Sequence, residues 1–270
     1  MVRTGPLSHD WPLEVSPLTV IMDGMRRHVP LANLTPRQQL RAGHLPRRVV
    51  QLLVGLVLYG VSMAMMIRST LGLDPWDVFH AGIASHVPLS FGQVTIVVGA
   101  LVLLLWVPLR QWPGLGTVAN VVVIGLAADA GLALIGSPEA LWARVLLLGS
   151  GIVLNGIAGG LYIGSQLGPG PRDGLMTGFA RRSGLSIRLV RTSIEVIVLS
   201  VGWLLGGPVG LGTVLYAVSI GPLVQFFLPR LTVDLRLADG TATSVDQAGD
   251  ENAVPVAPTS ALGSTLGSTS

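Results

Sequence analysis

The stretch Leu71-Gly-Leu-Asp-Pro-Trp-Asp77 returns 96 positions later as Leu167-Gly-Pro-Gly-Pro-Arg-Asp173. The match continues well beyond these seven residues without a gap, and 30 of the 88 positions in 47–134 are identical in 143–230. A shared apolar bias does not explain identical glycines, prolines and aspartates. The sequence therefore predicts two copies of one structural unit, in which each element of the first copy has a counterpart in the second.

The composition is that of an integral membrane protein. Half of the 270 residues are apolar, only 11% are charged, and the mean hydropathy is +0.66, whereas about a quarter of the residues in a soluble domain are charged. The chain contains no cysteine, which excludes disulfides and thiolate chemistry. All 17 basic residues are arginines, and we attribute the high pI to arginine-rich cytoplasmic loops rather than to nucleic-acid binding.

Six apolar segments are long enough to cross a bilayer core, which takes about 20 residues. The expected spans are 49–67, 92–109, 116–135, 145–167, 187–205 and 211–228. A short extra helix follows the first span of each copy, over 75–85 and 172–182. The predicted fold class is thus all-α: a polytopic membrane protein with six transmembrane helices as two three-helix repeats.

The repeats occupy 47–136 and 143–230 in this prediction, flanked by cytoplasmic segments. Segment 1–46 is expected to be partly disordered, with a short helix over 36–42 after a Thr35/Gln38 capping box, and 231–270 is expected to be a disordered tail. Arginines gather before the first span, in alternate loops and after the last span. This distribution predicts both termini in the cytoplasm of a bacterial plasma (inner) membrane.

Three spans per copy is an odd number, so the second copy must enter the membrane from the opposite face. The prediction is an inverted repeat, which is a recurring plan of secondary transporters. The candidate helix-start motif of the two short helices comprises Asp74, Pro75, Trp76, Gly170 and Pro171. If both helices re-enter the membrane, their positive N-terminal ends point toward a shared centre, as at ligand sites of transporter folds.

Five charged residues are candidates for a polar, ion or substrate site: Asp77, Asp173, Arg172, Glu195 and Asp129. Asp77 and Asp173 stand at the third position of the short helices, where a carboxylate either caps the helix or contributes to a paired cation or proton site. Arg172 replaces Trp76 in the second copy; it either clamps an anionic group or faces lipid headgroups, whereas Trp76 suits an interface anchor.

Glu195 and Asp129 lie within predicted spans, where an unpaired ionisable group costs several kcal/mol and therefore suggests function. The alternative for Glu195 is a helical ion pair with Arg191, four residues earlier. The alternative for Asp129 is a position near a wet interface. Uncharged polar residues inside spans, including Tyr59, Asn120, Asn155 and Gln225, are expected to form interhelical hydrogen bonds.

Signatures of catalysis and metal binding are weak. The sequence holds no H-E-x-x-H, G-x-S-x-G or P-loop motif. His80 follows Asp77 by three residues, but with His86 this makes no defined ligand set. The Gly-Leu-Gly-Thr segments at 114–117 and 210–213 suit close helix packing better than phosphate binding. We expect no cofactor, no metal and no enzymatic activity.

The motifs together resemble the YczE/YyaS/YitT-like family of bacterial integral membrane proteins. The resemblance covers about residues 45–230 and rests on the stretches at 71–78, 90–93, 113–117, 170–174 and 207–213, with Asn120 and Gly125. It implies a multi-pass membrane protein. Because the family is largely uncharacterised, it implies no substrate and no site residues.

Two function hypotheses follow. The first is a transporter or permease for a small solute or ion, supported by the inverted repeat with its Gly/Pro-marked breaks. The second is a non-transporting accessory or scaffold protein that acts on a membrane partner or on a second copy of itself. An intramembrane enzyme is the weakest alternative. Short helices that dip inward around a polar cavity would favour transport, and short helices lying flat around a dry core would favour the scaffold.

Overall fold

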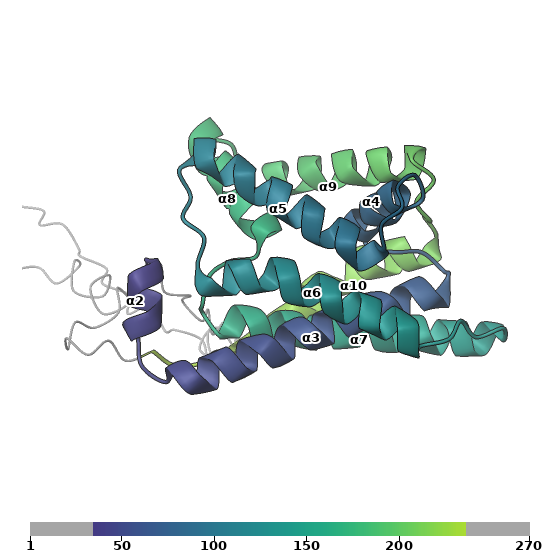
Figure 1. Cartoon of the computed structure of the whole chain (residues 1–270), viewed down its shortest axis with the longest axis horizontal. Helices are drawn as coiled ribbons and strands as arrows, with labels where there is room; N and C mark the ends of the chain where they lie inside the picture. The colour runs from purple at the N-terminus through teal and green to yellow at the C-terminus, as the bar shows by residue number, and fades with distance from the viewer. Residues whose placement is uncertain (1–34, 236–270) are drawn as a thin grey trace, which may run out of the picture.

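The computed structural model describes residues 35–235, and the regular secondary structure of this part of the chain is all helix (Figure 1). Its helices are α2 (Pro36–Arg41), α3 (Leu45–Ser69), α4 (Pro75–Ala84), α5 (Phe91–Leu109), α6 (Leu115–Leu134), α7 (Leu141–Gly164), α8 (Pro171–Ser183), α9 (Ile187–Leu204) and α10 (Leu211–Leu231). The two short helices, α4 and α8, follow α3 and α7 as expected, and α2 confirms the capping-box helix. The disorder predicted within 1–34 and 236–270 lies outside the described residues.

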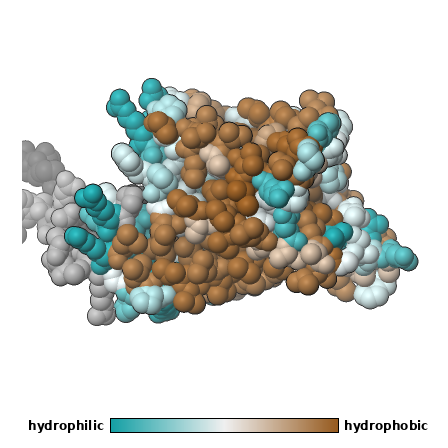
Figure 2. All heavy atoms as spheres, viewed as in Figure 1, coloured by the Kyte–Doolittle hydropathy of each residue, from teal (hydrophilic) through white to brown (hydrophobic). Residues whose placement is uncertain are grey.

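Five helices are long and apolar enough to cross a membrane: α3, α5, α6, α7 and α10. Apolar side chains cover most of the visible face of the molecule, and hydrophilic ones gather mainly toward the two ends of its long axis (Figure 2). The predicted fifth span, α9, is an 18-residue helix, but Arg188, Arg191 and Glu195 set it apart from the other five. The fold is therefore that of a multi-pass helical membrane protein.

The largest error in the predicted bounds concerns the fourth span. The prediction of 145–167 is wrong at both ends, because α7 begins at Leu141 and ends at Gly164. Gln166 and Gly168 have positive φ values of 54° and 120°, which a helix does not tolerate. The backbone thus leaves the helix before Leu167 and turns toward α8.

Helices α3 and α7 form the centre of the molecule and run antiparallel (Figure 1). At the start of α3, the Arg48 side chain donates to the carbonyls of Ser165 and Gln166 at the end of α7, each at 2.8 Å. At the start of α7, Arg144 donates in the same way to the carbonyls of Ser69, at 2.9 Å, and Thr70, at 3.2 Å. Each helix therefore supplies a guanidinium that caps the end of the other.

The remaining helices pack around this pair. α6 lies along α3 and α10 lies along α7, while α5 and α9 form a second layer with the short helices (Figure 1). α4 packs against α9, and α8 packs against α5, so each short helix is held mainly by a helix from the other copy. In Figure 1 the short helices lie toward opposite ends of the long axis.

Glycines at matching places allow the bends before the short helices to pack tightly. Gly72 and Gly168 adopt φ values of 122° and 120°, a region in which only glycine is unstrained. The Gly212 amide donates to the Leu71 carbonyl and the Gly116 amide donates to the Leu167 carbonyl, both at 2.8 Å. The Gly-Leu-Gly-Thr segments therefore serve close packing between the copies, as the sequence predicts.

Candidate functional site

The start of α4 is defined by two buried carboxylates. Asp74 is the N-cap, and its Oδ1 accepts from the Asp77 amide at 2.8 Å, while Pro75 occupies the first turn. Asp74 is 2% exposed and Asp77 is fully buried. The predicted capping geometry is therefore confirmed for α4, but it uses only one of the four carboxylate oxygens.

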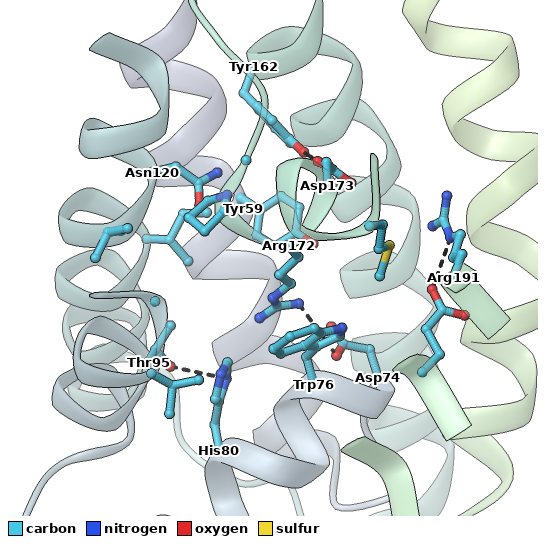
Figure 3. Close-up of a pocket in the computed structure, with 18 of the residues that line it drawn as sticks. Tyr59, Asp74, Trp76, His80, Thr95, Asn120, Tyr162, Arg172, Asp173 and Arg191 are labelled. Carbon is cyan, nitrogen blue, oxygen red and sulfur yellow. Dashed lines mark hydrogen bonds and ion pairs between the residues drawn. The ribbon is translucent and has the colours of Figure 1, made fainter. Parts of the chain in front are cut away.

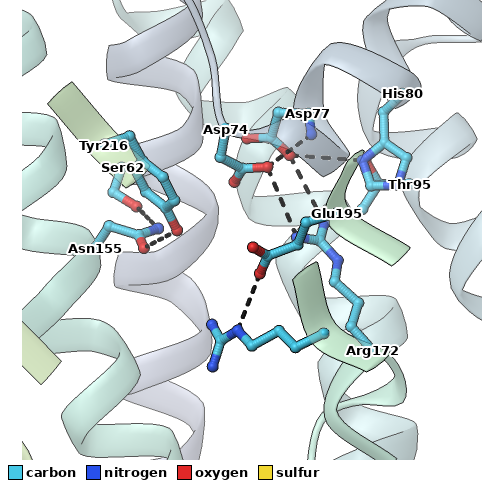
Figure 4. A network of polar contacts seen from close by, with 10 residues as sticks. Ser62, Asp74, Asp77, His80, Thr95, Asn155, Arg172, Glu195 and Tyr216 are labelled. Atoms are coloured by element: carbon cyan, nitrogen blue, oxygen red, sulfur yellow. Dashed lines mark hydrogen bonds and ion pairs between the residues drawn. The ribbon is translucent and has the colours of Figure 1, made fainter. Parts of the chain in front are cut away.

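Arg172 brings the start of α8 against the start of α4. Its guanidinium nitrogens lie 3.9 Å from Asp74 Oδ1 and 3.7 Å from Asp77 Oδ1 (Figure 4). The guanidinium also lies over the Trp76 ring, 4.9 Å from its centroid. The two helix starts therefore face each other. Arg172, which stands where the first copy of the motif has Trp76, joins them.

These ion pairs leave hydrogen-bonding capacity unused. Both nitrogen–oxygen distances exceed the length of a hydrogen bond. Asp74 Oδ2, both carboxylate oxygens of Asp77 and the Trp76 indole nitrogen are buried without a hydrogen-bond partner. Buried polar atoms are nearly always hydrogen-bonded, so four atoms without a protein partner in one place make this junction a candidate site.

A cavity of about 120 Å³ lies beside this junction (Figure 3). Both copies of the repeat contribute to its walls. Among its polar and aromatic lining residues are Tyr59, Asp74, Trp76, His80, Thr95, Asn120, Tyr162, Arg172, Asp173, Arg191, Glu195 and Tyr216. The chain has only three tyrosines, and all three line this cavity.

Two more predicted site residues lie at the cavity wall. Asp173 Oδ2 accepts from the Tyr162 hydroxyl at 2.8 Å. Arg191 Nε donates to Glu195 Oε1 at 3.0 Å, which is the helical ion pair given above as the alternative to a functional role for Glu195. Arg191 and Glu195 are also 59% and 36% exposed, so the wall of the cavity that α9 forms reaches the surface of the molecule.

His80 lies next to Asp77, one of the two buried aspartates. Its Nδ1 is 3.5 Å from Asp77 Oδ1 and 3.4 Å from the Thr95 hydroxyl (Figure 4). Within residues 35–235 no three His, Asp or Glu side chains are grouped to hold a metal ion. His86 instead contacts Ser85 and the Gly82 carbonyl at the end of α4.

Asp129 lies apart from this group. Its carboxylate accepts from the Ser90 hydroxyl and, at 2.8 Å, from the Gly92 amide. It therefore caps the start of α5 from the neighbouring helix α6, and it does not line the cavity.

Several cavity residues are not among the candidates from sequence. Tyr216 donates to Asn155 Oδ1 at 3.0 Å, and Asn155 donates to the Ser62 hydroxyl at 2.9 Å (Figure 4). Asn155 fulfils its predicted interhelical role. Tyr162 and Tyr216 are missed because a tyrosine in an apolar helix resembles packing. The repeat does offer a signal for Tyr216. This residue stands 96 positions after Asn120, at the matching place of the second copy, and both residues line the cavity.

A family model described as "Family of unknown function (DUF6198)" matches residues 46–229. The chain belongs to this family. It is 44% identical over 177 residues to an uncharacterized protein of Haemophilus influenzae, covering 66% of this chain and 81% of that protein. It is 33% identical over 178 residues to the uncharacterized membrane protein YczE of Bacillus subtilis, covering 65% and 83%.

A third relative, the uncharacterized protein YyaS of Bacillus subtilis, is 24% identical over 180 residues, covering 65% of this chain and 90% of that protein. No solved structure matches the chain. The expected relationship to YczE and YyaS is thereby confirmed, and the description of YczE as a membrane protein agrees with the five apolar helices of this chain.

Proposed function

We propose that this DUF6198 member is a transporter or permease for a small solute or ion. The observation that carries the proposal is that Arg172, at the start of α8, reaches the two carboxylates at the start of α4 beside a cavity lined by polar side chains. Broken helices whose N-terminal ends face a shared site are how transporter folds bind substrate. Buried charged groups in a membrane protein are expensive and therefore indicate function.

The proposal includes six spans arranged as an inverted repeat, in which α9 is the fifth span and α10 the sixth, with both termini cytoplasmic in the inner membrane. Its support is the antiparallel pairing of α3 with α7 and the reciprocal capping by Arg48 and Arg144. The Arg191–Glu195 ion pair lowers the cost of placing α9 in the membrane. The arginine distribution supports the orientation.

The proposed substrate site comprises Asp74, Asp77 and Arg172 at the helix junction, with Asp173 and Glu195 on the cavity wall. Trp76 forms one face of this site through its ring, and Gly170 and Pro171 line the cavity at the start of α8. Asp129 is left with a supporting role at the start of α5.

The scaffold hypothesis keeps one observation in its favour. Only Gly212, Thr213 and Tyr216 of α10 are buried, so a long apolar face of this helix is available to lipid, a partner or a second copy. It does not explain buried acids around a cavity, which is why transport is the better-supported function.

The test is solute flux into liposomes that contain the purified full-length protein, recorded with and without a proton gradient across a panel of small solutes and ions. We expect flux for one member of the panel, with a loss of at least tenfold in Asp77→Asn. Glu139→Gln, an identical loss of charge on the exposed link between the repeats, serves as the control and should keep full flux. Absence of flux for every solute, together with a stable co-purifying partner, favours the scaffold.

A further inference from the structure

We propose that the central cavity binds a small organic cation, such as a guanidinium or alkylammonium ion. This inference rests on the proposed function, because it names the substrate class of the same site. It is carried by the juxtaposition of three tyrosines, one tryptophan and unsatisfied carboxylate oxygens around one cavity.

The aromatic residues supply the first half of the argument. Tyr59, Tyr162, Tyr216 and Trp76 all line the cavity, although the chain is only 5% aromatic. Faces of aromatic rings attract cations, and aromatic enclosures are a known means of recognising ammonium groups. An inorganic ion gains less from such walls than an organic cation, which also has apolar surface to bury.

The carboxylates supply the second half. Asp74 lines the cavity, is 98% buried, and its Oδ2 has no hydrogen-bond partner. Asp74, Asp77, Asp173 and Glu195 bring four acidic groups to the site, while Arg172 and Arg191 bring two basic ones. The excess of acid and the free acceptor favour a ligand that is positively charged and donates hydrogen bonds.

Arg172 shows what the site recognises. Its guanidinium lies over the Trp76 ring while it faces both Asp74 and Asp77. These are the contacts that a free guanidinium ion would make, at distances that leave room for closer hydrogen bonds. The Arg172 side chain, a tethered occupant because it is held by its own helix, therefore already fills the edge of the site. A free cation competes with it for the carboxylates.

The size of the cavity limits the ligand. A volume of about 120 Å³ is several times the space that one water molecule needs. A cation of a few non-hydrogen atoms fits this space. A divalent metal ion fits the chemistry less well, because within the described residues no three His, Asp or Glu side chains are close enough together to hold one metal ion.

The test is isothermal titration of guanidinium chloride, at low millimolar concentration, into the purified full-length protein in detergent. Sodium chloride at the same ionic strength is the reference. We expect saturable binding of guanidinium to the wild-type protein and none of sodium. Asp74→Asn should weaken guanidinium binding at least tenfold, which corresponds to about 1.4 kcal/mol. Glu139→Gln, on the exposed link, should bind within about twofold of wild type.

Two further variants keep the test decisive. Asp173→Asn removes a cavity carboxylate without removing the cap of α4, and carries the test if Asp74→Asn is not monodisperse. Arg172→Ala removes the tethered occupant, so guanidinium should bind about fivefold more tightly or better. A wild-type titration indistinguishable from sodium chloride overturns the proposal, and so does unchanged affinity in both folded Asp variants.

The failure of this inference is distinguishable from the failure of transport. Saturable guanidinium binding without guanidinium flux in liposomes would keep the site and overturn its use in transport. Flux of another solute by a protein that does not bind guanidinium would overturn the organic-cation assignment alone.

Discussion

Helices α5 and α6 of the first copy are sealed together, whereas their counterparts α9 and α10 in the second copy scarcely touch. In the first pair, Gly92 and Gly125 let the backbones meet, and a Cβ at Gly125 would lie 2.5 Å from the Gly92 carbonyl oxygen. In the second pair, the counterpart of Gly125 is Gly221, which has no atom within 4 Å of where its Cβ would stand.

The difference can be traced to three substitutions between matching positions. Arg188 stands where the first copy has Gly92, and Gln225 stands where it has Asp129. Glu195 stands where it has Gly99, which packs on Val121. A bulky, charged residue in place of a contact glycine prevents two helices from approaching closely. The corresponding pair of helices is therefore closely packed in the first copy and open in the second.

This contrast bears on the proposed function. The open pair contributes Arg191, Glu195 and Tyr216 to the cavity, and the first two are also exposed. If the protein transports as proposed, the gap between α9 and α10 is the side on which the cavity communicates with its surroundings. On the same proposal, we expect the closely packed pair α5 and α6 to close the other side.

The largest expected difference between the two pairs is in disulfide formation. A Cβ at Gly99 would lie 3.6 Å from Val121 Cβ, within the range of a disulfide. We expect the double variant Gly99→Cys/Val121→Cys to cross-link nearly completely under mild oxidation. Because the chain has no cysteine of its own, the product can be read directly as a mobility shift after proteolysis between the two helices.

The matching pair, Glu195→Cys/Ala217→Cys, is the control for that experiment. Its positions correspond residue for residue to Gly99 and Val121, but α9 and α10 lie apart, so we expect little or no cross-link. Equal cross-linking of both pairs would show that the two copies close alike and would remove the contrast.

A smaller effect is expected from adding one methyl group at matching glycines. Gly125→Ala places a Cβ 2.5 Å from the Gly92 carbonyl oxygen and 2.6 Å from Ile96 Cγ1. Overpacking of this kind costs about 1–3 kcal/mol. Gly221→Ala meets no atom and gains up to about 1 kcal/mol of helix propensity. Thermal unfolding in detergent should therefore shift downward for Gly125→Ala, and stay level or rise for Gly221→Ala.

Sequence reasoning reaches the elements of this fold more easily than their convergence. The helix starts at Pro75 and Pro171 and the Asp74 cap are local patterns, and the structure bears them out. That Arg172 reaches Asp74 depends on how two helices 96 residues apart meet, which no local pattern encodes. Tyr162 and Tyr216 could not be recognised as cavity residues from the sequence, because an aromatic side chain in an apolar helix usually serves packing.

The smallest effect concerns Asp129, which completes the sealed pair. Its carboxylate accepts from the Ser90 hydroxyl and the Gly92 amide, and so ties the start of α5 to α6. Asp129→Asn keeps an oxygen for one of these donors but removes the charge, so we expect a loss of about 1 kcal/mol. Its counterpart Gln225 is exposed, and Gln225→Ala should change stability by less than about 0.5 kcal/mol. If Asp129→Asn instead leaves stability untouched but abolishes flux in liposomes, the residue belongs to the transport pathway rather than to the seal.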